Sequence, residues 1–386
     1  MSTRSRLQAR RRAFSAGIPD YQLLGERSIS TLFVTGFPGF LASGLLPRLL
    51  ERGSSLSAVC LVESRFVSAA HHRIQEWELA DPSLKGRVRI VEGDITEPDL
   101  GLGPAHELKA EVNEVFHLAA IYDLAVAAEP AQRINVDGTR HLLDFAAECR
   151  RSGLERFHYV STCYVSGRYA GAYSEADLDK GQEFNNHYEE SKFRAEVLVQ
   201  NAQSGGLPAT IYRPSIVVGD SRTGATQKYD GPYAFIRWIL RQRGVAIVPR
   251  VGDQSRSRLN VVPSDYVTTA ISALSALPHS VGRVYQLADP DPPTIAEFLS
   301  LLETACGRRL LRVPIHRTFL KAFLTRTPGA SRLMGVPAEL VDYLVHPTYY
   351  TAGAAAEDLK GTGIEVPRLA SYLDALVTFV RNNPRL

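Results

Sequence analysis

The sequence predicts an α/β fold: a doubly wound parallel sheet with helices on both faces, followed by a smaller, mostly helical C-terminal lobe. Two observations predict this fold class. Short apolar runs alternate with segments of helical periodicity from about residue 30 to 220, and strands joined by helices form parallel sheets that helices cover. The 386 residues are enough for such a domain with an appended lobe.

The elements follow the chain in a regular order. Residues 41–50 repeat leucine at helical spacing, and Gly53 ends that helix. Further helices are expected over 131–150 and 188–202. The expected strands are 31–34, 56–62, 88–91, 114–118, 157–160, 209–212 and a later segment at 259–262.

The composition is that of a folded globular chain. Hydrophobic residues make up 45% and charged residues 22%, which excludes global disorder. Apolar stretches stay below the roughly 18–20 residues of a membrane-spanning helix. The formal net charge of +3 is too small to predict nucleic-acid binding. Four well-separated cysteines without a CxxC pair predict neither disulfides nor a metal site and favour the cytoplasm.

A glycine motif of the form GxxGxxA lies between the first strand and the first long helix. Gly36 permits a tight turn, Gly39 allows the backbone to approach a pyrophosphate, and Ala42 permits close packing of helix and strand. The start of the helix offers free N–H groups to phosphates. The motif predicts a Rossmann-like dinucleotide site, with these candidate residues: Gly36, Pro38, Gly39, Phe40 and Leu41.

We expect three parts in the chain. Residues 1–29 form a basic arm, with five arginines among the first twelve residues and none of the apolar run of a secretory signal. This arm lies on the surface or contacts anionic lipid or an acidic partner. Residues 30–220, with about 258–275, form the dinucleotide-binding domain. Residues 221–257 and 276–386 form the substrate-binding lobe, and from about 286 onward we expect helices without a strand rhythm.

The end of the second strand gives conflicting indications about the cofactor. Glu63 stands where an acidic residue would bind the ribose 2′-hydroxyl of NAD and repel the 2′-phosphate of NADP. Arg65 and Arg73 follow closely, and either guanidinium suits that phosphate. Glu63 as a solvated charge at the end of the strand is a third interpretation.

Two later strand ends offer further cofactor contacts. Asp94 and Ile95 follow the third strand, where Asp94 either accepts the adenine amino group or caps the next turn. Ala119 and Ala120 follow the fourth strand and leave room for a cofactor across the strand ends. His117, just before them, is expected to be a packed structural histidine.

Tyr188 and Lys192 are four positions apart on one expected helix face, and Thr162 ends the fifth strand. An ammonium beside the phenol would favour the phenolate and lower the pKa of Tyr188 from about 10. The phenol would exchange a proton with a carbonyl oxygen while hydride moves at carbon, and Thr162 would hold the same oxygen. Cys163 as a covalent nucleophile is a less favoured alternative, since no base is evident beside it.

These motifs resemble those of the extended short-chain dehydrogenase/reductases, over about residues 31–275. The similar segments are the glycine turn, Gly93-Asp94-Ile95, His117-Leu118-Ala119-Ala120, Asn135-Val136-Asp137-Gly138-Thr139, Arg213-Pro214-Ser215 and the Thr162, Tyr188, Lys192 set. The resemblance implies that Thr162, Tyr188 and Lys192 are catalytic. It implies that Asn135 supports a proton relay, and that the backbone near Pro214 and Ser215 holds the nicotinamide.

Within that family the chain is most similar to fatty acyl-CoA reductases and thioester reductases. The similar segments are residues 160–167, 184–196 and 213–224. The likeness implies reduction of an acyl thioester to an aldehyde, with further reduction to an alcohol left open. It implies NADPH, whereas Glu63 keeps NADH open, and it implies a homodimer. Peripheral membrane contact by a cytoplasmic protein is compatible with it.

Arginines cluster around Trp238 in the expected lobe. Arg237, Arg241 and Arg243 are candidates for gripping the phosphates of coenzyme A or of a carrier-protein arm. Scattered solvated arginines are the alternative. Three other functions stay open: a dehydrogenase of a bulky hydroxy or keto substrate such as a hydroxysteroid, a nucleotide-sugar epimerase, and a binding protein that senses the dinucleotide.

Overall fold

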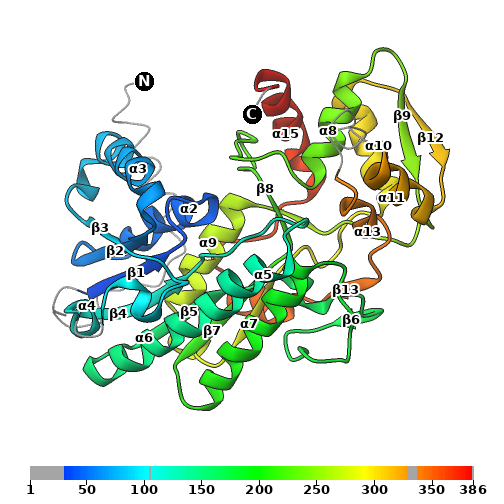
Figure 1. Ribbon diagram of the computed structural model, residues 1–386. Helices are drawn as coiled ribbons and strands as arrows, with labels where there is room; N and C mark the ends of the chain where they lie inside the picture. Colours follow the sequence, from blue (N-terminus) through cyan, green and yellow to red (C-terminus); the bar gives the residue numbers. More distant parts are fainter. Residues whose placement is uncertain (1–29, 104–105, 328–336, 385–386) are drawn as a thin grey trace.

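The structure, a computed structural model, describes residues 30–103, 106–327 and 337–384 (Figure 1). The basic arm expected over residues 1–29 lies outside the described residues. A seven-stranded parallel sheet with the strand order β11-β7-β5-β4-β1-β2-β3 forms the centre of the main domain. The chain winds outward in both directions from β1, which confirms the doubly wound fold class.

Six of the seven strands correspond to predicted apolar runs. The strands of the main sheet are β1 (Ser30–Thr35), β2 (Leu56–Val62), β3 (Val88–Glu92), β4 (Val112–His117), β5 (Arg156–Val160), β7 (Ala209–Pro214) and β11 (Val284–Leu287). The strand order reverses between β1 and β4. In parallel sheets, ligands bind in the crevice at the carboxyl ends of the strands beside such a point.

Helices cover both faces of the sheet because its strands are apolar on both sides. Leu32 and Val34 of β1 pack toward one set of helices, and Phe33 between them packs toward the other. The first set is α2 (Phe40–Leu50), α3 (Val67–Ala80), α9 (Ser264–Ser275) and α14 (Gly353–Asp358). The second set is α4 (Leu108–Glu111), α6 (Gly138–Ser152) and α7 (His187–Ser204), of which α6 and α7 run side by side in Figure 1.

The C-terminal third contains strands that the sequence did not predict. β11 belongs to the main sheet, although we expected residues 276–386 to form the lobe. β12 (Leu310–Pro314) and β13 (Thr348–Tyr350) pair with the distant β9 (Ala246–Arg250) and β6 (Gly171–Tyr173). The segment expected at 259–262 becomes β10 (Val261–Pro263), which pairs with β8 (Ile216–Val218) outside the main sheet. Strands of three to five residues are too short to show a period.

The lobe is built mainly of helices beside the small β9–β12 sheet. Its helices are α8 (Pro232–Arg241), α10 (Ile295–Cys306), α11 (Arg317–Arg326), α13 (Leu340–Tyr343) and α15 (Leu369–Asn382), and a short α5 (Ala128–Ala131) lies in the main domain. One face of the last helix is an apolar stripe that packs into the lobe. Its buried residues are Leu369, Tyr372, Leu373, Leu376, Val377 and Val380.

Three histidines are buried in the neutral form. His117 bonds Thr35 Oγ1 at 2.8 Å and Thr139 Oγ1 at 3.0 Å, as expected for a packed structural residue. Burial lowers the pKa of His117 to about 3 and the pKa values of His158 and His346 to about 4. Because the charged imidazolium is disfavoured in the folded state, protonation opposes folding.

We expect the protein to lose stability as the pH falls from about 6.5 to 4. The unfolded histidines take up protons near pH 6.5 while the folded ones stay neutral, so each costs about 2 kcal/mol at pH 5. Urea unfolding at pH 7.5 and pH 5 measures the loss. Equal unfolding free energies at the two pH values would contradict the assignment.

Candidate active site

The glycine motif forms a tight turn where β1 leads into α2. Gly36 has a φ of +87°, and a Cβ there would lie 2.7 Å from the backbone N of Ala119 and from the carbonyl carbon of Leu118. The N–H of Gly39 donates to the Gly36 carbonyl at 2.8 Å, and a Cβ at Gly39 would lie 2.6 Å from that oxygen. Gly39 caps α2 without a side chain, so the N-terminal N–H groups face outward. This cradle fits a pyrophosphate.

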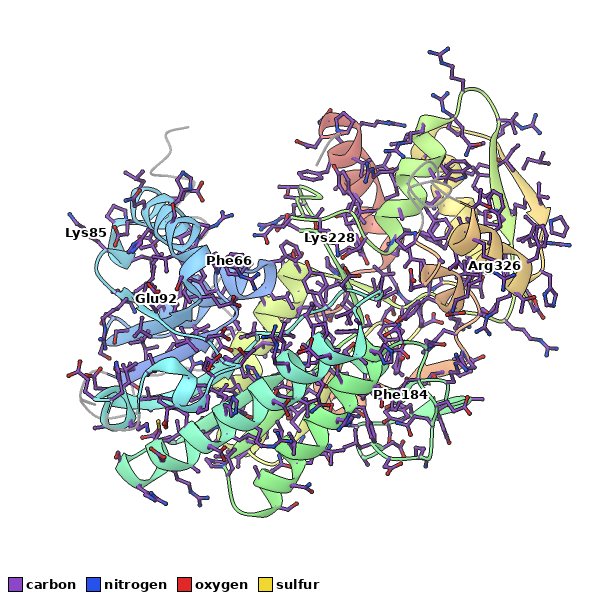
Figure 2. The ribbon with its side chains drawn as sticks, viewed as in Figure 1. Phe66, Lys85, Glu92, Phe184, Lys228 and Arg326 are labelled. Atoms are coloured by element: carbon purple, nitrogen blue, oxygen red, sulfur yellow. The ribbon has the colours of Figure 1, made fainter. Side chains whose placement is uncertain are left out.

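A pocket of about 530 Å³ lies at the carboxyl ends of β2 and β3, which suits the adenosine half of a dinucleotide. Glu63 and Arg65 both line it, and their side chains form an ion pair at 2.7 Å. The complete lining is Glu63, Ser64, Arg65, Glu92, Gly93, Asp94 and Gly101. Figure 2 labels Glu92 and Phe66 at this side of the main domain.

Of the residues predicted to bind the adenosine half of the cofactor, some line this pocket and others lie outside it. Asp94 lines the pocket, and its Oδ1 accepts the N–H of Thr96 at 2.8 Å, so the capping interaction is present. Ile95 is buried, and it packs against Gly138 in the core. Arg73 is outside the lining and pairs with Glu76 at 2.9 Å.

Thr162, Tyr188 and Pro214 meet at the carboxyl ends of β5 and β7. Tyr188 lies in the first turn of α7, where Asn186 caps the helix, and its phenol is close enough to the side chain of Thr162 for Thr162 to lower the pKa of the phenol. The hydroxyl of Thr162 donates to the carbonyl of Pro214 at 3.3 Å and accepts the N–H of Tyr164 at 3.2 Å. The two hydroxyls therefore converge on one place beside the strand ends.

The pKa of Tyr188 moves opposite to the predicted direction. Burial raises it to about 12, and the side chain of Thr162 offsets only part of this rise. Tyr188 is partly buried, whereas Lys192 is fully buried, and burial lowers the pKa of Lys192 to about 7. Its Nζ donates to the hydroxyl of Tyr159 and to the carbonyl of Val160, both at 2.8 Å. Burial has the largest effect on both groups, because desolvation disfavours both charged forms.

Asn135 connects the loop after β4 to the helix that carries Tyr188. It lies on a π-helical turn, Gln132–Asp137. Its Nδ2 donates to Ser191 Oγ at 2.9 Å, and its Oδ1 accepts the N–H of Ile121 at 2.9 Å. Asn135 therefore fixes the position of α7 relative to this loop.

A buried ion pair fixes α7 against the strand ends, and no sequence pattern indicated it. Arg213 on β7 donates from Nη2 to Glu196 on α7 at 2.6 Å, and neither side chain is exposed. Ser161 donates to the other oxygen of Glu196 at 2.5 Å. These residues, like Tyr159, are far apart in sequence, so no spacing could reveal them.

The remaining predicted residues at the nicotinamide end lie close to the turn and the strand ends. Ala119 donates its N–H to Thr35 Oγ1 at 3.2 Å, and Ala120 follows it in the same loop. Ser215 is buried, and its Oγ has no hydrogen-bond partner among the described residues. Cys163 Sγ donates to the Arg213 carbonyl at 3.0 Å, and burial raises the pKa of this thiol, which disfavours the covalent mechanism.

Loops from the main domain and the lobe meet near Tyr188. The Nζ of Lys228 lies 5.1 Å from the ring centroid of Tyr122, and Figure 2 shows Lys228 on the side of the lobe that faces the main domain. The charge of Asp230 and the phenol of Tyr122 both raise the pKa of Tyr188, so these groups surround it.

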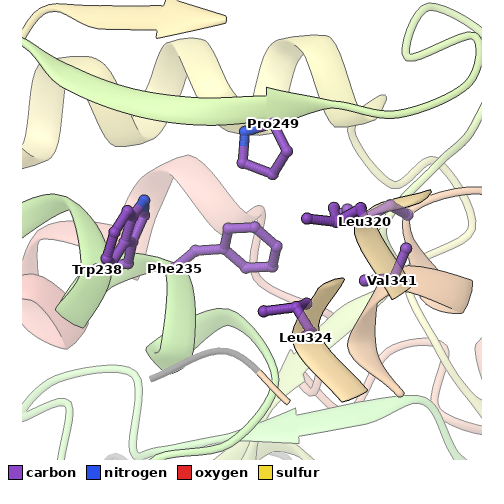
Figure 3. Close-up of a pocket in the computed structure, with 7 residues that line it drawn as sticks. Phe235, Trp238, Pro249, Leu320, Leu324 and Val341 are labelled. Atoms are coloured by element: carbon purple, nitrogen blue, oxygen red, sulfur yellow. The ribbon is translucent and has the colours of Figure 1, made fainter. Parts of the chain in front are cut away.

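The predicted substrate arginines lie on or just after α8. Arg237 stacks over the ring of Tyr229 at 5.1 Å, whereas Arg241 and Arg243 are exposed where α8 leads to β9. A pocket in the lobe is entirely apolar and has a volume of only about 10 Å³ (Figure 3). This volume holds about one water molecule, so the pocket is a packing gap. Its lining is Phe235, Trp238, Pro249, Leu320, Leu324, Val341 and Leu344.

The fold and this site define an NAD(P)-dependent oxidoreductase of the extended short-chain dehydrogenase/reductase class, similar to thioester reductases. Residues 34–271 match the model of an NAD-binding family described as "Male sterility protein", and the chain belongs to that family. No helix in the described part of the chain has the length and apolar character needed to cross a membrane.

Several relatives contain a similar segment within a longer protein. A linear gramicidin synthase of Brevibacillus parabrevis is 30% identical over 291 residues, which are 72% of this chain and 6% of that protein. The aldehyde reductase lnbA of Aspergillus flavus is 27% identical over 301 residues, 73% of this chain and 29% of that protein. The matched segment thus spans less than a third of either relative.

Solved structures extend the similarity over nearly the whole chain. The terminal R domain of the myxalamid PKS-NRPS pathway is 29% identical with a TM-score of 0.76, covering 94% of this chain and 93% of that domain. A UDP-glucuronic acid 4-epimerase from Bacillus cereus in complex with NAD is 21% identical with a TM-score of 0.64, covering 92% and 97%. The second likeness shows the fold alone.

We expect Gly36→Ala to weaken NAD(P)H binding at least tenfold, because its Cβ would strike the backbone of the loop after β4. Gly86→Ala is the matched control, since Gly86 also has a positive φ of +72° but nothing within 4 Å of the added carbon. Nicotinamide fluorescence measures affinity, and thermal unfolding checks the fold. Equal affinities in the two variants would contradict the assigned turn.

Proposed function

We propose that the protein reduces an acyl thioester, carried by coenzyme A or by a carrier protein, to an aldehyde and a thiol. The convergence of the Thr162 and Tyr188 hydroxyls at the strand ends carries this proposal. The likeness to the myxalamid R domain, at 29% identity over 94% of the chain, supports it. An apolar acyl chain is the expected substrate, and a homodimer remains an expectation from the resemblance.

In the proposed reaction the bound nicotinamide supplies a hydride to the thioester carbon. Thr162 holds the carbonyl oxygen, and Tyr188 donates its proton to that oxygen as negative charge develops. The hydroxyl of the resulting hemithioacetal then gives its proton back to Tyr188 as the carbon–sulfur bond breaks, which leaves an aldehyde, and the departing sulfur takes up a proton and leaves as a thiol. One hydride and one proton are consumed. The pKa of about 12 keeps Tyr188 protonated at neutral pH, as a proton donor must be.

The proposed cofactor contacts extend from the glycine turn to the end of β7. Gly36, Pro38, Gly39, Phe40 and Leu41 surround the pyrophosphate at the start of α2. Asp94 faces the adenosine pocket. The loop with Ala119 and Ala120, Lys192, and the segment with Pro214 and Ser215 lie toward the nicotinamide, where Asn135 supports proton transfer. Ile95 acts by packing.

NADPH is the proposed cofactor, and NADH is the alternative that Glu63 favours. Arg65 is the guanidinium that lines the adenosine pocket, but Glu63 neutralises it at 2.7 Å. Binding of a 2′-phosphate would therefore require Arg65 to leave Glu63, and Arg73 is a second candidate once it leaves Glu76.

We expect Glu63→Gln to improve the affinity for NADPH relative to NADH about tenfold, since it removes a repelling carboxylate and releases Arg65. Glu111→Gln is the control, because it releases the exposed Arg89 outside the pocket. Fluorescence titration with both cofactors measures the ratio. If the ratio of the NADPH and NADH affinities is unchanged in Glu63→Gln, Glu63 does not select between the two cofactors.

A second step from aldehyde to alcohol is a further candidate activity, favoured by the 27% identity to the aldehyde reductase lnbA. The same two hydroxyls suit this step, because a carbonyl oxygen again receives the proton. The Arg237, Arg241 and Arg243 group is proposed to bind the phosphates of the thiol-bearing arm.

We expect purified protein with NADPH and long-chain acyl-CoA to consume reduced nicotinamide and release free thiol. Tyr188→Phe should lower kcat by about 10²–10⁴-fold, because it removes the proton donor. Tyr349→Phe, which removes a hydroxyl from a half-exposed ring, is the control. Oxidation of NADPH by ketones without thiol release would instead favour the hydroxysteroid type of activity.

A further inference from the structure

A short helix of the lobe touches the helix that carries Tyr188. The hydroxyl of Tyr343 on α13 donates to Glu189 Oε1 at 2.6 Å and accepts a bond from Asn186 Nδ2 at 3.1 Å. Glu189 directly follows Tyr188, and Asn186 is the N-cap of α7. A single tyrosine from the lobe therefore holds both residues that define the first turn of the catalytic helix.

Glu189 is a carboxylate buried without a cation. Its exposed fraction is 0%, and it takes part in none of the ion pairs found among the described residues. Asn185 donates to it from its backbone N–H at 2.8 Å and from Nδ2 at 3.1 Å, and Tyr343 supplies the remaining bond. Neutral donors alone hold the charge, so the loss of one leaves a costly unmet acceptor.

The other side of α13 is fixed to the lobe. Asp342, which precedes Tyr343, is buried and binds two cations of α11, Arg317 at 2.8 Å and Lys321 at 2.6 Å. Leu340 at the start of α13 packs against Ala234 of α8. These contacts connect α8 and α11 to the segment that carries Tyr343.

We propose that Glu189 and Tyr343 are positioning residues for Tyr188, and that α13 is the link through which the lobe sets the orientation of the catalytic phenol. This inference rests on the proposed catalytic role of Tyr188. It assigns to the lobe a part in forming the catalytic geometry, in addition to binding substrate.

The electrostatics agree with the geometry. Burial has the largest effect on the pKa of Tyr188 and raises it. The charges of Glu189 and Asp230 and the phenol of Tyr122 raise this pKa further. Burial likewise raises the pKa of Glu189, whereas the bonds from Tyr343 and Asn185 lower it and Asp342 raises it. The bond from Tyr343 thus opposes the effect of burial on Glu189 and favours its charged form, and a negative charge beside Tyr188 favours the protonated phenol.

The test compares Tyr343→Phe with Tyr350→Phe. Tyr350 is a buried tyrosine of the same segment, but it bonds Ser166 and His346 and makes no bond to α7 among the described residues. We expect Tyr343→Phe to lower kcat about tenfold or more while KM for the thioester and the affinity for NADPH stay within twofold. Tyr350→Phe should keep kcat within twofold even where its thermal stability falls.

Hydrogen exchange supplies a readout that needs no activity. Amides of residues 186–192 should exchange at least tenfold faster in Tyr343→Phe than in Tyr350→Phe, because the first turn of α7 loses its hold. If the wild-type protein reduces no thioester, the proposed function is wrong. The exchange rates then still test whether Tyr343 positions the start of α7. Equal exchange in the two variants, or equal kcat values in an active enzyme, would overturn the inference.

Two further combinations of substitutions test whether α13 connects the lobe to Tyr188, and they distinguish this connection from a general loss of stability. Glu189→Leu combined with Tyr343→Phe should lower kcat no more than Glu189→Leu alone, because Leu already removes the acceptor of the Tyr343 hydrogen bond. Arg317→Met with Lys321→Met should release Asp342 and reproduce the kcat loss. Arg326→Met on the same helix is the control, since Arg326 is not one of the two cations that bind Asp342 (Figure 2). Additive losses, or full activity after the release of Asp342, would contradict the link.

Discussion

The site depends on the buried ion pair between Arg213 and Glu196. Arg213 belongs to β7 and Glu196 to α7, and Ser161 at the end of β5 completes the cluster. Removing either Arg213 or Glu196 would leave the other as an unpaired buried charge, at a cost of about 3–5 kcal/mol. The pair therefore fixes where α7 crosses the strand ends, and thereby brings Tyr188 to Thr162. Without this anchor the two hydroxyls would have no common position.

The second constraint on α7 comes from outside the main domain. Glu196 holds the middle of the helix against the sheet, while Glu189 at its start is held by Tyr343 of the lobe. Both carboxylates are fully buried, but of the two only Glu196 has a cationic partner among the described residues. An ion pair thus holds the middle of α7 at the sheet. A weaker hydrogen bond from a neutral donor holds the start of α7 at the lobe. The contact from the lobe lies next to Tyr188, the proposed proton donor.

Sequence patterns revealed local features and missed those that depend on distant partners. Six strands were visible as apolar runs, but β11 was hidden because four residues with a buried Gln286 show no period. Glu189 and Glu190 look alike in the sequence. Only Glu189 is buried, because Tyr343 reaches it from 154 positions away, whereas the side chain of Glu190 is 46% exposed. Burial also determines whether the pKa of Tyr188 is raised or lowered, and the spacing of Tyr188 and Lys192 in the sequence does not reveal burial.

Burial acts on Tyr188 and Lys192 in a way that suits reduction. It raises the pKa of the phenol to about 12 and lowers that of the amine to about 7, so both neutral forms are favoured. A phenol that stays protonated donates to an oxygen that is becoming negative, whereas oxidation of an alcohol would need a phenolate. An amine with a pKa near neutrality exchanges protons readily at physiological pH. For the proposed reaction, Tyr188 therefore supplies a proton donor for the step of hydride transfer, and Lys192 is an amine able to take up protons between turnovers.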